Sequence, residues 1–357
     1  MNILRFALVG CGRISKRHCD VLTEGKIDGA KLVAVCDKNS AKAEEAGNKY
    51  SVPFFLDMHE MMMSQNIDVV VVLTESGNHA RHVIELAKYR KDIIVEKPMA
   101  LTVKDADAMI AACANAKVRL FVVKQNRFNL PVIKLREAIE AKRFGKLILG
   151  TIRVRWSRTQ DYYDQDDWRG TWALDGGVLT NQASHHIDLL EWMMGGVDKV
   201  IGFSKNALAD IEAEDTAIAI IQFKNGALGV IEASTAVRPK DLEGSISIMG
   251  ELGTVEIGGF AVNEIKVWNF FNSTSDDAMV KNQFSVNPPN VYGFGHQSYY
   301  EHVVSCIAND QHHMVDGVEG RKSVELIHAI YNSIESGHAA IIDEKPRSLR
   351  LGQGKPD

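Results

Sequence analysis

A short apolar run that ends in a glycine-x-glycine turn, at Gly10 and Gly12, constrains this chain more than any other feature. The run Phe6–Val9 predicts a buried strand, and a helical pattern follows the turn. Gly10 permits a tight turn, and Gly12, which has no Cβ, lets a pyrophosphate approach the N–H groups of the helix start. The third position of this fingerprint holds Ser15, which loosens helix–strand packing but leaves the phosphate cradle intact.

A second predicted strand, Leu32–Cys36, ends in Asp37. A carboxylate at this spacing reaches the adenosine ribose hydroxyls of a dinucleotide and repels a 2′-phosphate. A glycine pair alone is a weak signal, because ordinary tight turns also use it. The whole series of strand, glycine turn, helix, strand and aspartate predicts a dinucleotide site that takes NAD rather than NADP.

Strand and helix patterns alternate from residue 4 to about residue 123. The β-rich runs are Leu4–Val9, Leu32–Cys36, Val69–Leu73, Ile93–Val95 and Leu120–Val123, and amphipathic stretches separate them. Alternation of this kind predicts a doubly wound, parallel sheet with helices on both faces.

The pattern changes after about residue 146, where β-rich runs follow one another between turn signals. These runs are Ile148–Trp156, Val200–Ala207, Ala217–Phe223, Ala227–Ala236, Ser245–Met249, Thr254–Ile257 and Ile265–Phe270. With one helix at 184–194, they predict a large, mostly antiparallel sheet. Helical patterns at 297–308 and 320–336 close the chain, and 272–292 is predicted to be a loop. We expect an α/β protein with an NAD-binding domain at 1–124 and a substrate-binding domain at 125–357.

Composition narrows the class of protein further. The 357 residues are enough for two domains, and the net charge of -5 argues against nucleic acid or an anionic membrane as a partner. The apolar run at Val69–Leu73 is too short to span a bilayer. Five scattered cysteines without C-x-x-C spacing indicate reduced thiols and a cytoplasmic location.

The first candidate catalytic group is Lys97, in the sequence Glu96–Lys97–Pro98 that follows the predicted strand Ile93–Val95. Ligands of open α/β sheets bind outside the carboxyl ends of the strands, so Lys97 is expected beside the nicotinamide. A partly desolvated lysine there can exchange a proton with a substrate hydroxyl. The alternative is a solvated loop lysine.

A second candidate group follows Gly176–Gly177. Asn181 and His185 are four residues apart and share one face of a helix that begins early enough, where an amide and an imidazole suit a sugar hydroxyl. The alternatives are a capping asparagine and a half-buried histidine. A metal site from His185, His186 and Asp188 is disfavoured, because adjacent histidines point apart on a helix.

A third group combines arginine with aromatic residues. Arg155, Arg158 and Tyr163 are candidates for binding nucleotide phosphates or a uronate, and Lys124 adds a donor for sugar hydroxyls. The alternative is one face of an edge strand.

These motifs together resemble the glucose–fructose oxidoreductase, inositol dehydrogenase and rhizopine catabolism (Gfo/Idh/MocA) family. The matching residues are Gly10, Gly12, Ile14, the Glu-Lys-Pro motif, Gly176–Gly177, His185 and Asp188. The resemblance implies a Rossmann domain and an open-sheet domain that supports oligomers. It also implies NAD(P)-dependent oxidation of sugars or cyclitols by the lysine and the histidine. Many members carry aspartate where this chain has Asn181, so a carboxylate–histidine dyad is not assumed.

The resemblance completes the expected site. We expect the catalytic residues to be Lys97, His185 and Asn181. The expected substrate contacts are Lys97, Lys124, Arg155, Arg158, Tyr163, Asn181 and His185. The expected NAD contacts are Gly10, Gly12, Arg13, Ile14, Asp37, Thr74, Ser76, Asn78, His79, Glu96, Lys97, Gln125, Trp168 and Arg169. No metal is expected.

A closer resemblance is to the bacterial UDP-N-acetyl-2-amino-2-deoxyglucuronate dehydrogenases. It rests on residues 121–127, 168–172, 181–185, 242–246 and 292–296. It implies oxidation of the C3 hydroxyl of a UDP-sugar in lipopolysaccharide sugar synthesis, before an aminotransferase acts. It further implies tightly held NAD, re-oxidised in some relatives by 2-oxoglutarate, and a homotetramer.

Two other classes stay open. One is a dehydrogenase of a different sugar or cyclitol, which needs no arginine cluster for a nucleotide. The other is a non-catalytic NAD(H)-binding regulatory protein, which has no need for Lys97 and His185 together.

Overall fold

The computed structural model describes residues 3–23, 25–285 and 294–354. Contacts divide the chain into two compact units, residues 1–125 with 296–321, and residues 126–295 with 322–357. Segment 296–321 therefore belongs with the first unit, whereas the sequence analysis assigned all residues after 124 to the second domain. The end of the predicted loop 272–292 and the start of the string 292–296 lie outside the described residues.

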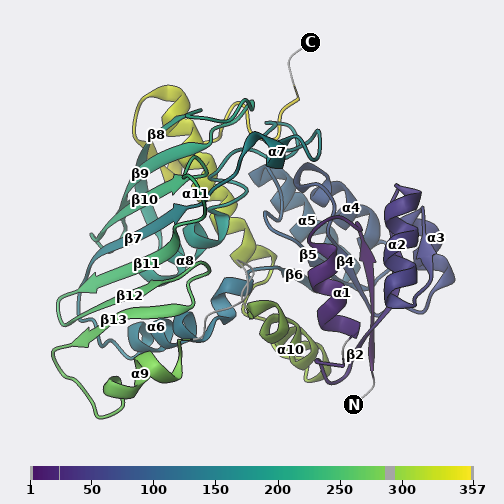
Figure 1. The fold of residues 1–357 in the computed structure, drawn as a ribbon, viewed down its shortest axis with the longest axis horizontal. Helices are drawn as coiled ribbons and strands as arrows, with labels where there is room; N and C mark the ends of the chain where they lie inside the picture. The colour runs from purple at the N-terminus through teal and green to yellow at the C-terminus, as the bar shows by residue number, and fades with distance from the viewer. Residues whose placement is uncertain (1–2, 24, 286–293, 355–357) are drawn as a thin grey trace. The chain divides into compact units, whose positions relative to one another are not determined.

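The first unit contains a six-stranded parallel sheet in the order β3-β2-β1-β4-β5-β6 (Figure 1). Its strands are β1 (Leu4–Val9), β2 (Ala30–Cys36), β3 (Phe54–Phe55), β4 (Val69–Val72), β5 (Asp92–Val95) and β6 (Leu120–Val122). The predicted doubly wound parallel sheet is confirmed. The order reverses between β1 and β4, and such switch points form ligand-binding crevices at the carboxyl ends of the strands.

The helices of this unit pack beside one another in pairs, α1 with α2 and α4 with α5. They are α1 (Ser15–Thr23), α2 (Ser40–Tyr50), α3 (Met58–Ser64), α4 (His79–Ala87), α5 (Val103–Ala116) and α10 (Gly295–Ala308), with a 3₁₀ turn η1 (Ser76–Asn78). Side-chain caps fix the starts of α2, α3 and α5; the hydroxyl of Thr102, for example, accepts the N–H of Asp105 at 3.0 Å. All four valines of β4 are fully buried, which places the core along the central strands.

The second unit contains an eight-stranded sheet in the order β13-β12-β11-β7-β10-β9-β8-β14. Its strands are β7 (Leu147–Arg155), β8 (Val197–Lys205), β9 (Thr216–Phe223), β10 (Leu228–Ser234), β11 (Glu243–Gly250), β12 (Gly253–Gly258), β13 (Glu264–Phe270) and β14 (Ala340–Ile341). Only the β7–β10 pair is parallel, so the predicted mostly antiparallel sheet is confirmed.

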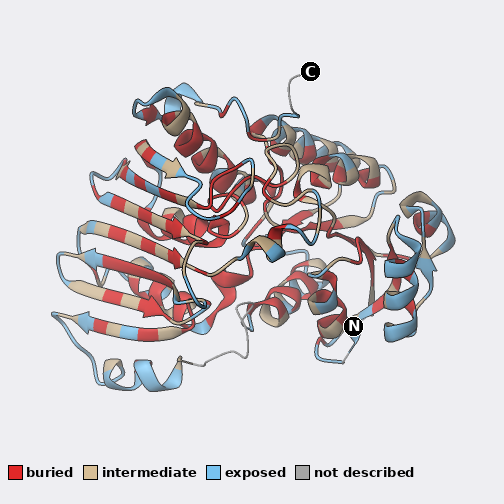
Figure 2. Cartoon of the chain, turned by 45° about the horizontal axis from the view of Figure 1, so that its top comes forward, coloured by how far each residue is buried: buried red, intermediate tan, exposed pale blue. Residues whose placement is uncertain are grey.

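One face of this sheet is covered by helix α8 (Ser184–Met194), which lies on β7 and β11. Gly150 of β7 allows this approach, because a Cβ there would lie 2.7 Å from the side chain of Met194. Burial alternates along the strands, and the opposite face stays partly exposed (Figure 2). The other helical elements are η2 (Gln125–Phe128), α6 (Leu130–Glu140), α7 (Gln160–Tyr163), α9 (Asp277–Gln283), α11 (Gly317–Ser336), which begins in the first unit, and η3 (Ile342–Glu344).

Helix α9 corrects the prediction of a loop over 272–292. Its first residue, Asp277, accepts hydrogen bonds from both terminal nitrogens of Arg143, from Trp268 Nε1 and from the N–H of Thr274. The Arg143 guanidinium, foremost among these, lowers the pKa of Asp277. The helix is thus held by long-range contacts that local periodicity does not reveal. None of the described helices is both long and apolar enough to cross a membrane.

The glycine turn gives a direct test of this fold. Gly10 has φ +104°, and a Cβ there would lie 2.7 Å from the backbone carbonyl of Leu73, whereas nothing lies within 4 Å of a Cβ at Gly12. We expect Gly10→Ala to lower the free energy of unfolding by about 3 kcal/mol in urea titrations of the apoprotein. Gly12→Ala, the matched control, should stay within about 1 kcal/mol of wild type. Equal stability of the two variants would contradict the turn geometry.

Candidate functional site

Five loops leave the carboxyl edge of the first sheet, and they carry most of the predicted cofactor contacts. Gly10–Ile14 follow β1, Asp37 follows β2, Thr74–His79 follow β4, Glu96–Lys97 follow β5 and Lys124–Gln125 follow β6. Because all six strands are parallel, these loops meet at one edge of the sheet.

The glycine turn is built to receive a pyrophosphate. Among the described residues, neither the N–H of Gly12 nor that of Ile14 donates a hydrogen bond within the chain. Ser15, the fingerprint's third position, is buried and its hydroxyl donates to the Gly12 carbonyl at 2.6 Å. The turn therefore keeps its shape through Ser15 and leaves backbone donors at the helix start for an anion, which fits a dinucleotide.

Asp37 is held in place by the same turn. Its Oδ2 accepts the N–H of Cys11 at 2.8 Å, and its Oδ1 accepts the N–H of Asn39 at 2.8 Å. Each carboxylate oxygen keeps a lone pair for a further donor. The geometry thus couples the ribose-binding candidate to the phosphate-binding candidate.

His79, predicted to line the middle of the cofactor, lies buried in this edge. Its Nδ1 is 2.8 Å from the Pro98 carbonyl oxygen and its Nε2 is 2.9 Å from that of Thr74. Burial lowers the pKa of His79. The ring therefore braces the loop after β4 against the loop after β5. Asn78 donates to Glu75 at 3.2 Å, and the Thr74 hydroxyl is 2.9 Å from Nδ1 of His82.

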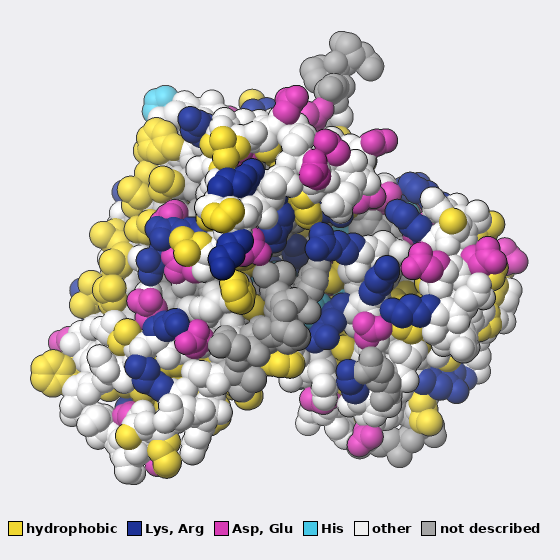
Figure 3. Space-filling model, viewed as in Figure 1, with side chains coloured by type: hydrophobic (Ala, Val, Ile, Leu, Met, Phe, Trp, Pro, Cys, Tyr) yellow, Lys and Arg dark blue, Asp and Glu magenta, His cyan; other side chains and the backbone are white. Residues whose placement is uncertain are grey.

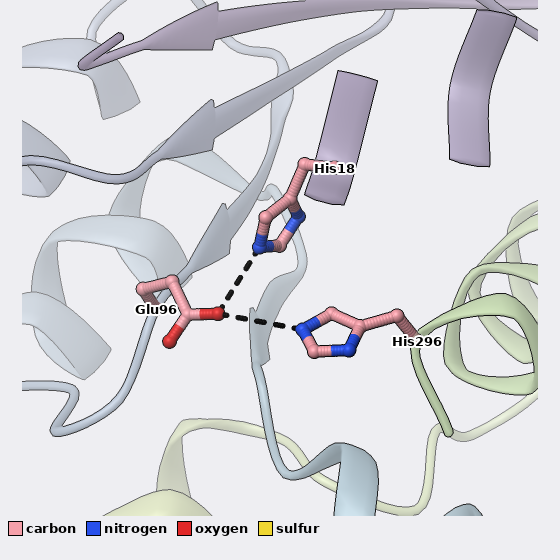
Figure 4. A group of neighbouring side chains, drawn as sticks. All are labelled: His18, Glu96 and His296. Atoms are coloured by element: carbon pink, nitrogen blue, oxygen red, sulfur yellow. Dashed lines mark hydrogen bonds and ion pairs between the residues drawn. The ribbon is translucent and has the colours of Figure 1, made fainter. Parts of the chain in front are cut away.

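Glu96 of the Glu-Lys-Pro motif lies in a buried cluster with two histidines (Figure 4). Its Oε1 is 3.1 Å from Nε2 of His18 and 3.9 Å from Nε2 of His296, and its Oε2 accepts the N–H of Lys97 at 2.8 Å. Burial raises the pKa of Glu96, but the hydrogen bond from His18 and the close approach of His296 outweigh it and hold this pKa well below its usual value. The ionised carboxylate therefore ties the backbone of Lys97 to the core.

The same three side chains offer two nitrogens and an oxygen of the kind that bind zinc. The positive charge of Arg17 acts on His296, and burial, the larger effect, lowers the pKa of His296 to about 4. His18 uses its other nitrogen at 2.7 Å from the Tyr300 hydroxyl. Because Oε1 of Glu96 is bonded to His18 and its Oε2 accepts the N–H of Lys97, we interpret the cluster as a hydrogen-bonded support for Lys97.

The polar group around Asn181 belongs to the second unit. The Asn181 amide donates to the Asp175 carboxylate, whose other oxygen accepts the N–H of Gly170 at 2.8 Å. Gln182 donates to Asn181 Oδ1 at 2.9 Å and to the Tyr162 hydroxyl at 3.0 Å. A carboxylate thus stands next to Asn181, although residue 181 itself is not an aspartate.

His185 is buried in the first turn of α8. Its neighbour His186 packs edge-on against Trp156, and burial lowers the pKa of His186 to about 4. Asp188 accepts two hydrogen bonds of 2.8 Å from Arg127. Both oxygens of Asp188 are therefore engaged by a guanidinium.

The predicted anion-binding arginines differ in placement. Arg155 points to the face of the sheet opposite α8, because its neighbour Val154 faces inward. It pairs with Glu232 at 2.6 Å and with Glu243 at 3.0 Å, so its charge is already neutralised. Arg158 lies with the polar group, 2.9 Å from Asp241 and stacked 5.5 Å from the Tyr162 ring.

Tyr163 and the Trp168–Arg169 pair are also engaged inside the second unit. The Tyr163 ring is buried with its hydroxyl 2.9 Å from Thr235 Oγ1, and burial raises the pKa of Tyr163 to about 12. Arg169 pairs with Asp166 at 3.0 Å and lies over the rings of Tyr162 and Trp168. Tyr163 and Arg155 remain predicted substrate contacts, and in this structure both have partners within the second unit.

Two members of this polar group, Asp175 and Gln182, are not among the predicted site residues. Asp175 stands immediately before the glycine pair, and Gln182 immediately after Asn181. Their proximity to predicted residues was visible in the sequence, but which neighbour turns toward the polar group depends on the turn between Gly176 and Ser184.

Comparison with known proteins gives matches along nearly the whole chain. The model of the NAD-binding Rossmann fold of the GFO/IDH/MocA oxidoreductase family matches residues 4–124, and that of its C-terminal alpha/beta domain matches residues 136–342. Among curated proteins, the myo-inositol 2-dehydrogenase of Thermotoga maritima is 31% identical over 239 residues, which are 65% of this chain and 68% of that protein.

Two solved structures are similar at higher identity. The WlbA dehydrogenase from Bordetella pertussis, in complex with NADH and UDP-GlcNAcA, is 40% identical with a TM-score of 0.88, over 96% of this chain and 98% of that chain. The WlbA dehydrogenase from Chromobacterium violaceum, in complex with the same two molecules, is 39% identical with a TM-score of 0.89, over 96% of each chain.

The Asp37 geometry predicts cofactor selectivity. Asp37→Ala should weaken NADH binding at least tenfold, because it removes the ribose acceptor and the anchor of the Cys11 N–H, and it should reduce the preference for NADH over NADPH. Fluorescence titration of both cofactors measures this. Asp28→Ala, at an exposed position of the same unit, is the control. Unchanged NADH affinity in Asp37→Ala would contradict the assignment.

Proposed function

Because the chain belongs to the Gfo/Idh/MocA family of NAD-binding oxidoreductases, we propose that it oxidises the C3 hydroxyl of UDP-N-acetylglucosaminuronic acid to the 3-keto sugar. The observation that carries this proposal is the identity of about 40% along nearly the full length of two dehydrogenases solved with UDP-GlcNAcA and NADH. The match to myo-inositol 2-dehydrogenase is lower in identity and covers a smaller share of this chain. It supports the alternative, a dehydrogenase of another sugar or a cyclitol.

The proposed chemistry divides between acid–base groups of this chain and its cofactor. When bound, NAD⁺ supplies the hydride acceptor. Lys97, with its backbone fixed by Glu96, accepts the proton of the C3 hydroxyl. His185 is the second candidate for that proton. Asn181, oriented by Asp175, holds a sugar hydroxyl, and so does Lys124.

Arg158 is the candidate for the anionic part of the substrate. It lies beside Tyr162 and Gln182, and a guanidinium next to aromatic rings suits a phosphate, a uronate or a uracil ring. In this proposal Trp168 and Arg169 contact the cofactor, as the family resemblance implies.

The proposed 3-keto product indicates which class of enzyme would act next in the pathway. A 3-keto sugar nucleotide is a substrate for an aminotransferase, so we place the reaction in the synthesis of lipopolysaccharide O-antigen sugars in the cytoplasm. Recycling of NADH by 2-oxoglutarate belongs to the same proposal.

The exposed face of the second sheet supports self-association, and we propose a homotetramer. Large apolar side chains project from this face (Figure 3): Phe203 of β8, Ile218 and Ile220 of β9, and Leu228 of β10. Neighbouring strands place Phe203 opposite Ile218, so the side chains form one continuous patch. Patches of this kind mark protein–protein contacts.

The substrate proposal predicts a change at the NADH absorbance band. Purified protein mixed with UDP-N-acetylglucosaminuronic acid should reduce its bound NAD⁺, and it should turn over repeatedly when 2-oxoglutarate is added. If added NAD⁺ alone sustains turnover, the proposed oxidation of the UDP-sugar is supported and the proposed recycling of NADH by 2-oxoglutarate is contradicted. Reduction by myo-inositol or a free hexose, with none by the UDP-sugar, would favour the alternative.

Lys97→Met tests the assigned proton acceptor in the same assay. We expect turnover to fall by about 10²–10⁴-fold while NADH affinity stays within about threefold, because the change removes a titrating group without altering the glycine turn. Lys104→Met, at an exposed lysine of α5, is the matched control. Full activity of Lys97→Met would contradict the mechanism.

A further inference from the structure

Glu214 is a buried carboxyl that the proposed chemistry does not use. It lies two residues before the start of β9, and its Oε1 accepts the N–H of Leu179 at 3.0 Å and the hydroxyl of Tyr331 at 2.8 Å. Its own carbonyl accepts the N–H of Val178 at 2.8 Å. Two of these bonds attach the segment before β9 to the turn that follows Gly176, and the third attaches helix α11 to Glu214 itself.

Tyr331 extends this attachment to the rest of the turn. Its hydroxyl accepts the N–H of Gly177 at 3.3 Å and lies 3.2 Å from Thr180 Oγ1. The ring is fully buried and packs edge-on against Trp172. Tyr331 therefore bridges both ends of the turn 177–180 to Glu214.

Gly177 shows how tightly the turn fits Glu214. A Cβ at Gly177 would lie 2.3 Å from the carboxyl carbon and from the backbone oxygen of Glu214. The turn continues directly into the candidate site, since the N–H of Asn181 bonds to the Gly177 carbonyl at 3.0 Å and α8, with His185, starts at Ser184. The position of the turn therefore sets the position of Asn181.

The second carboxyl oxygen of Glu214 has a different environment. Oε2 is buried, and no group among the described residues forms a hydrogen bond with it. An ionised carboxylate would leave a charged oxygen unsolvated, whereas a carboxylic acid can place its proton there. Burial raises the pKa of Glu214 to about 7, although its hydrogen bonds and the charge of Arg350 act in the opposite direction.

The ionisable groups near Glu214 are either paired with other residues or neutral. Arg350 pairs with Glu335 and stacks on Trp172. Asp215 accepts three backbone N–H groups at 207–209, and burial raises the pKa of Tyr331 well above its usual value, so Tyr331 stays neutral.

We propose that Glu214 is a positioning residue: its neutral acid, together with Tyr331, clamps the turn 177–180 and so places Asn181 for substrate, and its ionisation loosens the turn. The clamp is inferred from the contacts of Glu214 and Tyr331 with residues 177–180, and its effect on substrate binding rests on the proposed function. The direction in which stability changes with pH follows from the raised pKa of Glu214. The folded protein binds this proton more tightly than the unfolded chain, so stability is full below the unfolded value near 4.5 and is lost as pH rises through about 7.

Hydrogen exchange tests the clamp without any substrate. Glu214→Gln keeps an acceptor oxygen for Leu179 and Tyr331 but cannot ionise. At pH 5.5 the amides of residues 177–181 should exchange at equal rates in wild type and variant. At pH 9 they should exchange at least tenfold faster in wild type, and comparison at equal pH cancels the intrinsic pH dependence. Equal rates at both pH values would overturn the proposal.

Two further variants sharpen the result. Glu344→Gln, at an exposed glutamate of the same unit, should behave as wild type at both pH values. Tyr331→Phe removes the bridging hydroxyl and should raise exchange at both pH values. Failure of Glu214→Gln to fold at pH 5.5 would also contradict the clamp, because its amide imitates the neutral acid.

The positioning role has its own kinetic readout. In wild type, KM for the UDP-sugar should rise with pH relative to Glu214→Gln, while NADH affinity follows the same pH course in both. A pH-dependent difference in exchange without any difference in KM would overturn the positioning role. If the UDP-sugar is not a substrate, the exchange result still decides the clamp, so the two proposals fail separately.

Discussion

The steric contact between the glycine turn and the backbone after β4 is the constraint on which the first unit's site depends. Gly10 lies so close to Leu73 and Thr74 that any side chain would force the two loops apart. β1 and β4 are neighbours at the point where the strand order reverses. This contact therefore sets the width of the crevice in which a dinucleotide binds. Asp37 and His79 reinforce it, since the two polar side-chain atoms of each contact two different loops.

Two buried glutamates show how partners decide the charge state of the same side chain. Glu96 faces two imidazoles and a backbone N–H, which outweigh its loss of solvation and keep it ionised beside Lys97. Within the part of the chain that the structure describes, Glu214 has donors on one oxygen only, so burial dominates and raises its pKa to about 7. In both cases a carboxyl outside the reacting atoms holds the backbone that carries a proposed functional residue. Preorganisation of this kind places catalytic groups within the narrow tolerance that they need.

The sequence predicted the features that depend on local pattern and parallel topology. The family, the α/β class, both sheet types and NAD as cofactor are confirmed. They could be predicted because the order of strands, turns and helices alone brings Gly10, Asp37 and Lys97 to one edge of the sheet. The sequence predicted Arg155 as a ligand of nucleotide phosphates or a uronate, but it could not predict its pairing with Glu232 on the face of the sheet opposite α8. Helix α9 and the contact of Glu214 with Leu179 depend on long-range packing, which local periodicity does not encode. The contact of Asp175 with Asn181 is local, but it depends on the conformation of the turn between them.

Transfer of the C3 hydrogen tests the central claim most directly. UDP-N-acetylglucosaminuronic acid deuterated at C3 should be mixed with the NAD⁺-loaded protein, and the reduced cofactor analysed by mass spectrometry. The account predicts one deuterium in the reduced nicotinamide and none in the keto sugar, with a slower reduction than for the undeuterated substrate. A reduced cofactor without deuterium, formed while the sugar retains its label, would contradict oxidation at C3.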